Sequence, residues 1–165
     1  METQDHSVKP AASIGWIVAV LLVIVAWAGA YALRGGGDKE VMPGWADGMP
    51  AGQQLAQDTD KPMVVLFTAS WCGPCQSLKS NVLTKGDVNE ALQNNFVPVQ
   101  IDLSDQSPGN PNVAVAQQYG VTGIPTVIAM TPDGEPIGVY GGDSASAFVG
   151  WLDRMSSEDS SVSLR

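Results

Sequence analysis

The chain contains two cysteines, Cys72 and Cys75, which are separated by Gly73 and Pro74 and preceded by Trp71. A disulfide framework needs several bridges, and a structural zinc site needs four Cys or His ligands at metal-binding spacing. The one histidine lies in the N-terminal tail, so we expect no metal site and no bound cofactor. Closing so short a loop removes little entropy from the unfolded chain. The pair is therefore predicted to exchange electrons as a redox-active disulfide.

A strand and a helix must position the two sulfur atoms. Residues 62–68 are rich in Val, Leu and Phe, which is typical of a strand buried on both faces. Apolar residues then recur at helical spacing from Cys75 to Val82, and Pro74 suits a first helical turn. Cys72 thus begins a helix, where unpaired N–H groups and the helix dipole favour a thiolate. We interpret Cys72 as the nucleophile and the less exposed Cys75 as the resolving thiol.

Strands and helices alternate along the rest of the body. Asp87 with Glu90 three residues later predicts a capping box. Asn110 before Pro111 predicts the start of another helix, which Gly120 closes. An apolar stripe near the C-terminus predicts a last helix, so the order of elements predicts an α/β fold with a mixed sheet between helices. The strands are expected at residues 96–102, 126–130 and 136–140, with a turn at 132–134, and the stripe consists of Phe148, Trp151, Leu152 and Met155.

An uncharged apolar run occupies residues 14–33, and at 1.5 Å per residue it would span about 30 Å, the thickness of a hydrocarbon core. We interpret it as an uncleaved single-pass membrane anchor, with the lipid bilayer as partner. A cleaved signal peptide is the alternative, because residues 26–30 contain small-x-small patterns. Both interpretations place the body outside the cytoplasm, on the periplasmic side. The flanking positive charges favour the opposite orientation by one residue, because Lys9 precedes the run whereas Arg34 and Lys39 follow it.

Composition predicts the division of the chain into parts. The glycines and prolines of residues 34–52 are typical of a flexible tether, and the polar C-terminal end is typical of a fraying terminus. A net charge of −9 argues against a nucleic-acid partner. The predicted parts are a tail (1–13), the anchor (14–33), a linker (34–43), a folded domain (44–155) and a flexible tail (156–165).

The body resembles the thioredoxin family. The motif WCGPC follows a buried strand, GVTGIPT follows at residues 120–126, and the hairpin sequence PDGEPIGVYGG follows at residues 132–142. The resemblance covers residues 44–155 and is closer to membrane-tethered thioredoxin-like reductase domains than to small soluble thioredoxins. It implies the thioredoxin fold, protein disulfides as substrates and an external dithiol as electron donor. A Gly-Pro pair between the cysteines belongs to the reducing members of this family.

The resemblance also implies roles for neighbouring residues. Pro125 is expected to have a cis peptide bond and to face the cysteines, which leaves the backbone of Ile124 free to pair with an extended substrate segment. Trp71 is expected either to pack beside the helix start or to form the substrate-facing rim. Gly73 and Pro74 are expected to allow a close approach and to stiffen the first turn. All five are thus predicted substrate-binding residues.

Two positions depart from the family pattern. Thioredoxins commonly carry a buried Asp in the strand before the motif and a partner Lys, and the matching positions here are Leu66 and Gln100. Losing both is electrostatically consistent, because losing only one would leave a buried charge unpaired. We predict that Cys75 resolves the mixed disulfide more slowly than in a member with the Asp, or with help from water or a substrate group.

Three functions remain open. The first is a membrane-tethered reductase of protein disulfides, and the second is an oxidase or isomerase on the same fold, which differs in redox poise. The third is a non-catalytic binding or chaperone module that holds extended peptides against the Pro125 edge. The apolar run has no cysteine and no ionisable residue, so it cannot relay electrons across a bilayer. Turnover as a reductase therefore requires a separate membrane or soluble dithiol donor.

Overall fold

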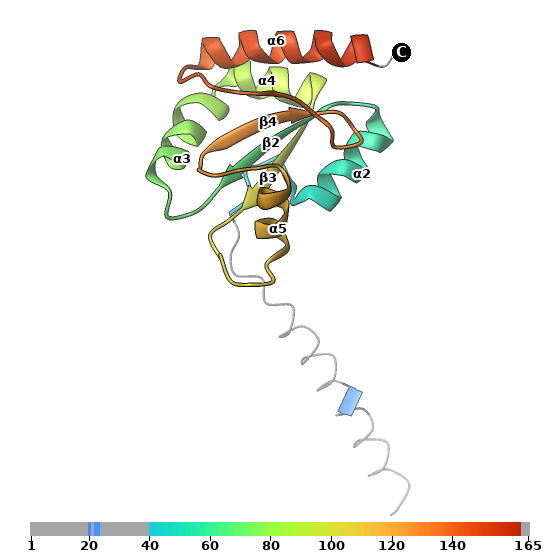
Figure 1. Ribbon diagram of the computed structural model, residues 1–165, viewed down its shortest axis with the longest axis vertical. Helices are drawn as coiled ribbons and strands as arrows, with labels where there is room; N and C mark the ends of the chain where they lie inside the picture. The colour runs from blue at the N-terminus through green and yellow to red at the C-terminus, as the bar shows by residue number, and fades with distance from the viewer. Residues whose placement is uncertain (1–19, 21, 24–39, 163–165) are drawn as a thin grey trace, which may run out of the picture. The chain divides into compact units, whose positions relative to one another are not determined.

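The computed structural model describes residues 20, 22–23 and 40–162 (Figure 1). The chain divides into two units, Met1–Lys39 and Glu40–Arg165, and the folded body is the second. The predicted N-terminal tail, most of the predicted anchor and most of the predicted linker lie outside the described residues. Among the residues that are described, no helix is both long enough and apolar enough to cross a bilayer.

One mixed sheet forms the centre of the body, in the order β1-β3-β2-β4-β5 (Figure 1). Strand β2 (Met63–Thr68) runs parallel to β3 (Val97–Asp102) and antiparallel to β4 (Thr126–Met130). The edges are β1 (Ala46–Asp47), parallel to β3, and β5 (Pro136–Val139), antiparallel to β4. Every residue of β2 is buried, as its sequence predicts. The predicted α/β fold with a mixed sheet is therefore confirmed.

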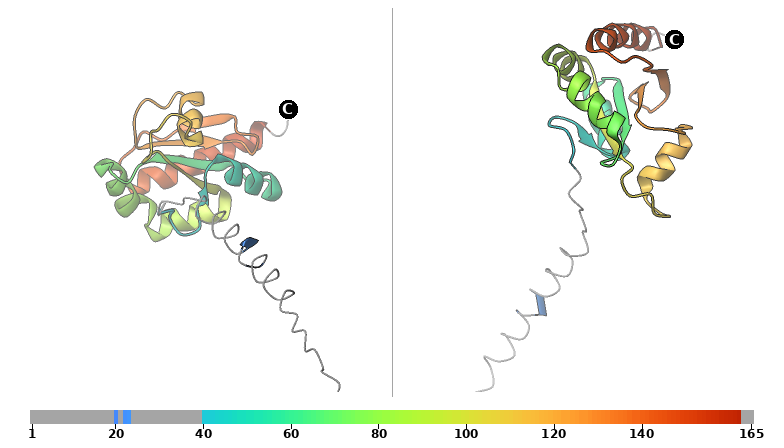
Figure 2. Two further views of the ribbon diagram at one scale, coloured as in Figure 1. Left: turned by 90° about the horizontal axis from the view of Figure 1, so that it is seen from below. Right: turned by 90° about the vertical axis from the view of Figure 1, so that its left-hand side faces the viewer.

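Helices cover both faces of the sheet (Figure 2). Alternate residues of β2 enter opposite layers, because successive side chains of a strand point to opposite faces. Val64 and Leu66 join the layer under η1, α4 and α6, whereas Val65 and Phe67 join the layer formed with α2 and α5. The helical elements are α2 (Met49–Thr59), α3 (Gly73–Leu78), the π-helical turn η1 (Lys79–Leu83), α4 (Gly86–Asn95), α5 (Pro111–Gln118) and α6 (Ala145–Val162).

The helix starts predicted at Asp87 and at Asn110 have different outcomes. Helix α4 begins at Gly86 with Lys85 as its N-cap and no side-chain capping bond, so the capping box predicted for Asp87 is wrong. Asp87 lies inside the first turn, where its charge still suits the positive end of the helix. Asn110 does cap α5, since its side chain accepts from the backbone N–H of Asn112 at 3.0 Å. A side-chain capping bond therefore marks the start of α5 but not the start of α4.

The sequence pattern did not predict helix α2. Residues from Glu40 onward, which have the composition of a tether, form β1 and the first turn of α2. Gly52 lies in α2 so close to β3 that a Cβ atom there would collide with the side chain of Val99. This glycine therefore permits a close approach rather than a flexible chain.

Helix α6 is the last helix of the body and packs on the face of the sheet that carries Val64 and Leu66. The predicted stripe is buried, with all four of its residues in the layer above Leu66. The helix continues to Val162, beyond the predicted end of the domain at residue 155. Backbone hydrogen bonds propagate a helix past its packed turns, so helix occupies most of the segment for which a flexible tail was predicted.

Candidate active site

The two cysteines form a disulfide at the start of α3, with an S–S distance of 2.03 Å and a Cα–Cα distance of 5.3 Å. Cys72 is the N-cap residue of α3, and its Sγ accepts from the backbone N–H of Cys75 at 3.2 Å. Such a donor favours a thiolate on Cys72 over a thiol. Cys72 is 5% exposed and Cys75 is 0% exposed, so an incoming sulfur can reach only Cys72.

The loop before β4 meets the disulfide from a distant part of the chain. The peptide bond between Ile124 and Pro125 is cis, as the family resemblance implies. The carbonyl oxygen of Ile124 lies 3.8 Å from the Sγ of Cys72. The side chain of Ile124 packs against a small cluster made by both cysteines and Ala69. The fold thus places a backbone acceptor beside the sulfur that is open to attack.

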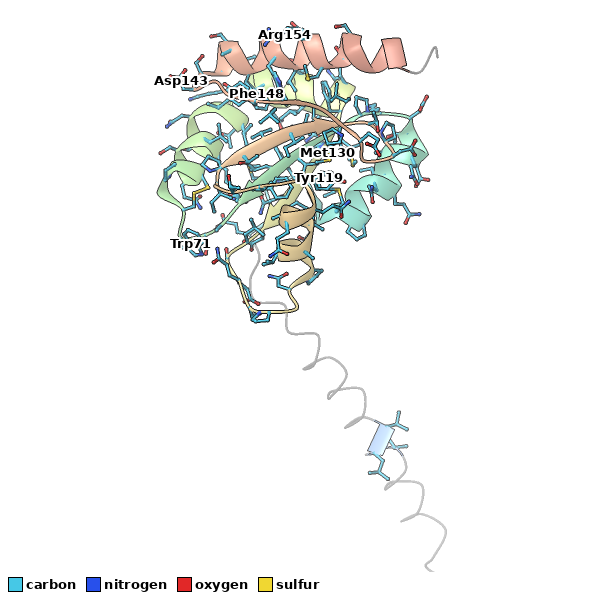
Figure 3. All side chains as sticks on the ribbon, viewed as in Figure 1. Trp71, Tyr119, Met130, Asp143, Phe148 and Arg154 are labelled. Carbon is cyan, nitrogen blue, oxygen red and sulfur yellow. A yellow bond between two sulfur atoms is a disulfide. The ribbon has the colours of Figure 1, made fainter. Side chains whose placement is uncertain are left out.

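Three of the predicted site residues surround Cys72 at the surface. Trp71 is 60% exposed (Figure 3), and Gly73 and Pro74 are also exposed. A Cβ atom added at Gly73 would meet nothing within 4 Å. The space beside the cysteine motif is therefore open to a partner molecule.

A loop after β3 holds the motif in place. Ser104 accepts from the backbone N–H of Ser70 at 2.7 Å through its Oγ, which itself donates to Asp102. The carbonyl oxygen of Ser104 accepts from the indole Nε1 of Trp71 at 3.3 Å. Ser104 also donates its backbone N–H to Asp102 at 2.8 Å. Sequence reasoning missed both residues, although an Asp two positions before a Ser at the end of a strand is a recognisable turn signal.

Leu66 and Gln100 face each other in register on β2 and β3, and they are 0% and 2% exposed. The side chain of Gln100 donates to the carbonyl oxygen of Glu40 at 2.9 Å and accepts from the backbone N–H of Met42 at 3.4 Å. The amide of Gln100 therefore attaches the segment Glu40–Met42, which precedes β1, to the sheet. Neither position can exchange a proton with Cys75.

Lys79 is the charged group that follows Cys75 by four residues on the same helical segment. Its backbone N–H donates to the carbonyl oxygen of Cys75. Burial lowers the pKa of the Lys79 ammonium, while the charges of Asp102 and Glu40 act in the opposite direction. A charged side chain therefore follows the buried sulfur by about one helical turn, and the charge of Asp102 at the end of β3 acts on it.

Comparison with known proteins places this site in a family. Residues 49–156 match the family model described as a thioredoxin-like domain. A chloroplastic thioredoxin of Arabidopsis thaliana is 34% identical over 84 residues, which are 51% of this chain and 43% of the relative. The thiol:disulfide interchange protein DsbD of Neisseria meningitidis is 30% identical over 103 residues, which are 61% of this chain and 16% of that protein. The chain thus spans less than half the length of these relatives.

A solved structure extends the likeness to three dimensions. The C-terminal domain of DsbD from Neisseria meningitidis, in its oxidised form, superposes with a TM-score of 0.51 at 27% identity. The match covers 64% of this chain and 90% of that domain. The described body therefore has a counterpart of similar architecture in a solved protein.

Proposed function

Because the chain belongs to the family of thioredoxin-like domains, we propose that it is a thiol–disulfide oxidoreductase that reduces disulfide bonds in proteins. The observation that carries the proposal is the disulfide itself, in which Cys72 is slightly exposed and Cys75 is fully buried. This asymmetry suits a cycle with one attacking and one resolving sulfur. We further propose that residues 14–33 tether the domain to a membrane, with the domain on the periplasmic side.

The cycle balances atoms and electrons within the dithiol. The Cys72 thiolate attacks a substrate disulfide, which forms a bond between Cys72 and one substrate sulfur and releases the other as a thiolate. Cys75 then attacks Cys72, forms the internal disulfide and releases the second substrate sulfur. Two electrons and the two protons of the protein thiols end on the two substrate thiols. A membrane or soluble dithiol donor returns both electrons and both protons.

The surface around Cys72 suits an extended substrate segment. Ile124 offers a backbone carbonyl oxygen beside the sulfur, and the exposed ring of Trp71 offers an apolar surface. Main-chain hydrogen bonds to an extended peptide are a common mode of recognition. Pro125, Gly73 and the neighbouring Pro74 complete the proposed substrate-binding surface.

The direction of electron flow can be tested with insulin and dithiothreitol. We expect the full-length chain to accelerate insulin reduction, with a reduction potential of the Cys72–Cys75 pair close to about −270 mV, as in reductants of this fold. A potential close to about −120 mV would instead support the oxidase alternative. Sidedness is a separate question, which protease added to cells with a permeable outer layer tests. A body that survives such treatment contradicts the periplasmic placement.

Replacing Ser104 by alanine is expected to lower kcat/KM for a protein disulfide about fivefold, the effect of one lost hydrogen bond. The variant loses the hydroxyl that joins Ser70 to Asp102. The backbone carbonyl that accepts from the Trp71 indole is kept, but Ser70, the residue before Trp71, is held less firmly when a large substrate docks. Reduction of a small disulfide such as oxidised glutathione should change less, because it does not need the Trp71 surface. Ser104→Thr keeps the hydroxyl and serves as control. Equal losses on both substrates would contradict this positioning role.

A further inference from the structure

The last residue of β2 carries a polar group with no partner. Thr68 is 0% exposed. Among the buried side-chain oxygen and nitrogen atoms of the described residues, its Oγ1 is the one that has no hydrogen-bond partner. Burying a hydroxyl without a partner costs free energy, and native proteins rarely do so. Valine has nearly the same shape and would avoid this cost. The hydroxyl therefore points to a partner in a state other than the disulfide form.

Thr68 lies on the side of the sheet that α3 covers. Val64 and Leu66 of β2 belong to the layer under η1, α4 and α6, and Thr68 follows Leu66 by two positions on the same face. The chain leaves Thr68, turns and enters α3, whose first turn carries the fully buried Cys75 (Figure 1). In such a strand-turn-helix unit, the first helical turn lies beside the end of the strand. Thr68 and Cys75 are thus both 0% exposed, at the two ends of the same strand-turn-helix connection.

The neighbouring positions on β2 and β3 are apolar or already have partners. Leu66 has no polar atom, and the amide of Gln100 bonds the backbone of Glu40 and Met42. The backbone N–H of Cys75 donates to Cys72. Opening the disulfide changes the needs of the Cys75 sulfur, because a thiolate requires hydrogen-bond donors far more than a disulfide sulfur does. The hydroxyl of Thr68 is a donor available for that purpose.

We propose that the Thr68 hydroxyl donates a hydrogen bond to the Cys75 sulfur once the disulfide has opened, in both the dithiol form and the mixed disulfide. This proposal rests on the proposed function. When the Cys75 thiolate attacks, a bond forms between Cys75 and Cys72, and the bond between Cys72 and the substrate sulfur breaks. The substrate thiolate takes up the proton that Cys75 released, and Thr68 keeps its own proton. Thr68 thus supports the step for which Leu66 provides no carboxylate.

Thr68→Val is expected to shift the equilibrium with dithiothreitol about tenfold toward the disulfide, equivalent to a reduction potential about 30 mV more negative. The variant loses a bond that exists only after reduction, while the disulfide form loses an unpartnered hydroxyl. In a Cys72→Ala background, the same change should raise the pKa of the Cys75 thiol, since a donor to the thiolate is removed. The charged groups nearby, Asp102 opposite Thr68 and Lys79 after Cys75, are identical in all variants.

Two matched variants of the full-length chain test the hydroxyl itself. Thr68→Ser keeps the hydroxyl and should stay within about twofold of wild type. Thr131→Val removes a hydroxyl that accepts from the backbone N–H of Glu135 in the β4–β5 turn, and it should leave the equilibrium unchanged. If the valine variant does not fold, Thr68→Ala replaces it in the same comparison.

Equal redox equilibria for the variants with and without the Thr68 hydroxyl would overturn the proposal, provided that the wild-type chain reduces insulin. An unchanged pKa of the Cys75 thiol would overturn it as well. A wild-type chain that reduces no disulfide refutes the proposed function instead. The redox equilibrium of the pair is measurable without substrate turnover, so the two failures are distinguishable.

Discussion

The Cys72→Ser variant is expected to lose disulfide reduction by at least about a thousandfold, because a serine hydroxyl is not ionised near neutral pH and is a far weaker nucleophile than a thiolate. Cys72 is the sulfur with access to solvent and to the Ile124 carbonyl oxygen. Insulin reduction under identical dithiothreitol concentrations measures the loss. Binding of an extended peptide should persist, which separates catalysis from a purely binding function.

The Cys75→Ser variant is the matched control. Its Cys72 can still attack a substrate, but no thiol remains to resolve the adduct, so a covalent mixed disulfide should accumulate. Electrophoresis without reductant detects the adduct, and dithiothreitol should release it. Adduct formation by Cys72→Ser, with none by Cys75→Ser, would reverse the assignment of the two sulfurs.

The Leu66→Asp variant is expected to combine a large loss of stability with faster resolution of the mixed disulfide. Leu66 is 0% exposed, and its neighbour across the sheet is the amide of Gln100, which already bonds Glu40 and Met42. Burying a carboxylate without a positive partner should lower the free energy of unfolding by about 3 kcal/mol or more. The same carboxylate can accept the proton of Cys75, so the mixed disulfide should have a shorter lifetime.

Leu66→Asn separates these two effects. The asparagine also buries a polar group, so it should destabilise the fold in chemical denaturation, but it has no basic oxygen to accept a proton. We therefore expect it to leave the lifetime of the mixed disulfide close to that of wild type. Equal lifetimes for the wild-type and Leu66→Asp chains would remove the idea that Cys75 lacks a proton acceptor at this position.

The sequence alone identified the features that depend on local spacing. The unbroken apolar run of β2 predicts a central strand, and Asn110 before Pro111 predicts the start of α5, because both signals act through neighbouring backbone groups. The spacing of Cys72 and Cys75 at a helix start likewise predicts a redox pair. The capping box at Asp87 failed because a nearby residue can begin a helix without a side-chain cap.

Only the tertiary structure decided which distant segments meet. Gly52 looks like part of a tether in sequence, but in the fold it allows α2 to approach Val99. Sequence reasoning missed Ser104, whose role arises from its contact with Trp71. The family motif identified Ile124, but only the fold shows that its carbonyl oxygen lies beside the sulfur of Cys72. Residue spacing determines the period of local hydrogen bonds, whereas contacts between distant segments depend on how side chains fill the space between packed layers. Leu66 and the motif beside it could therefore be identified from sequence, but the unpartnered hydroxyl of Thr68 could not.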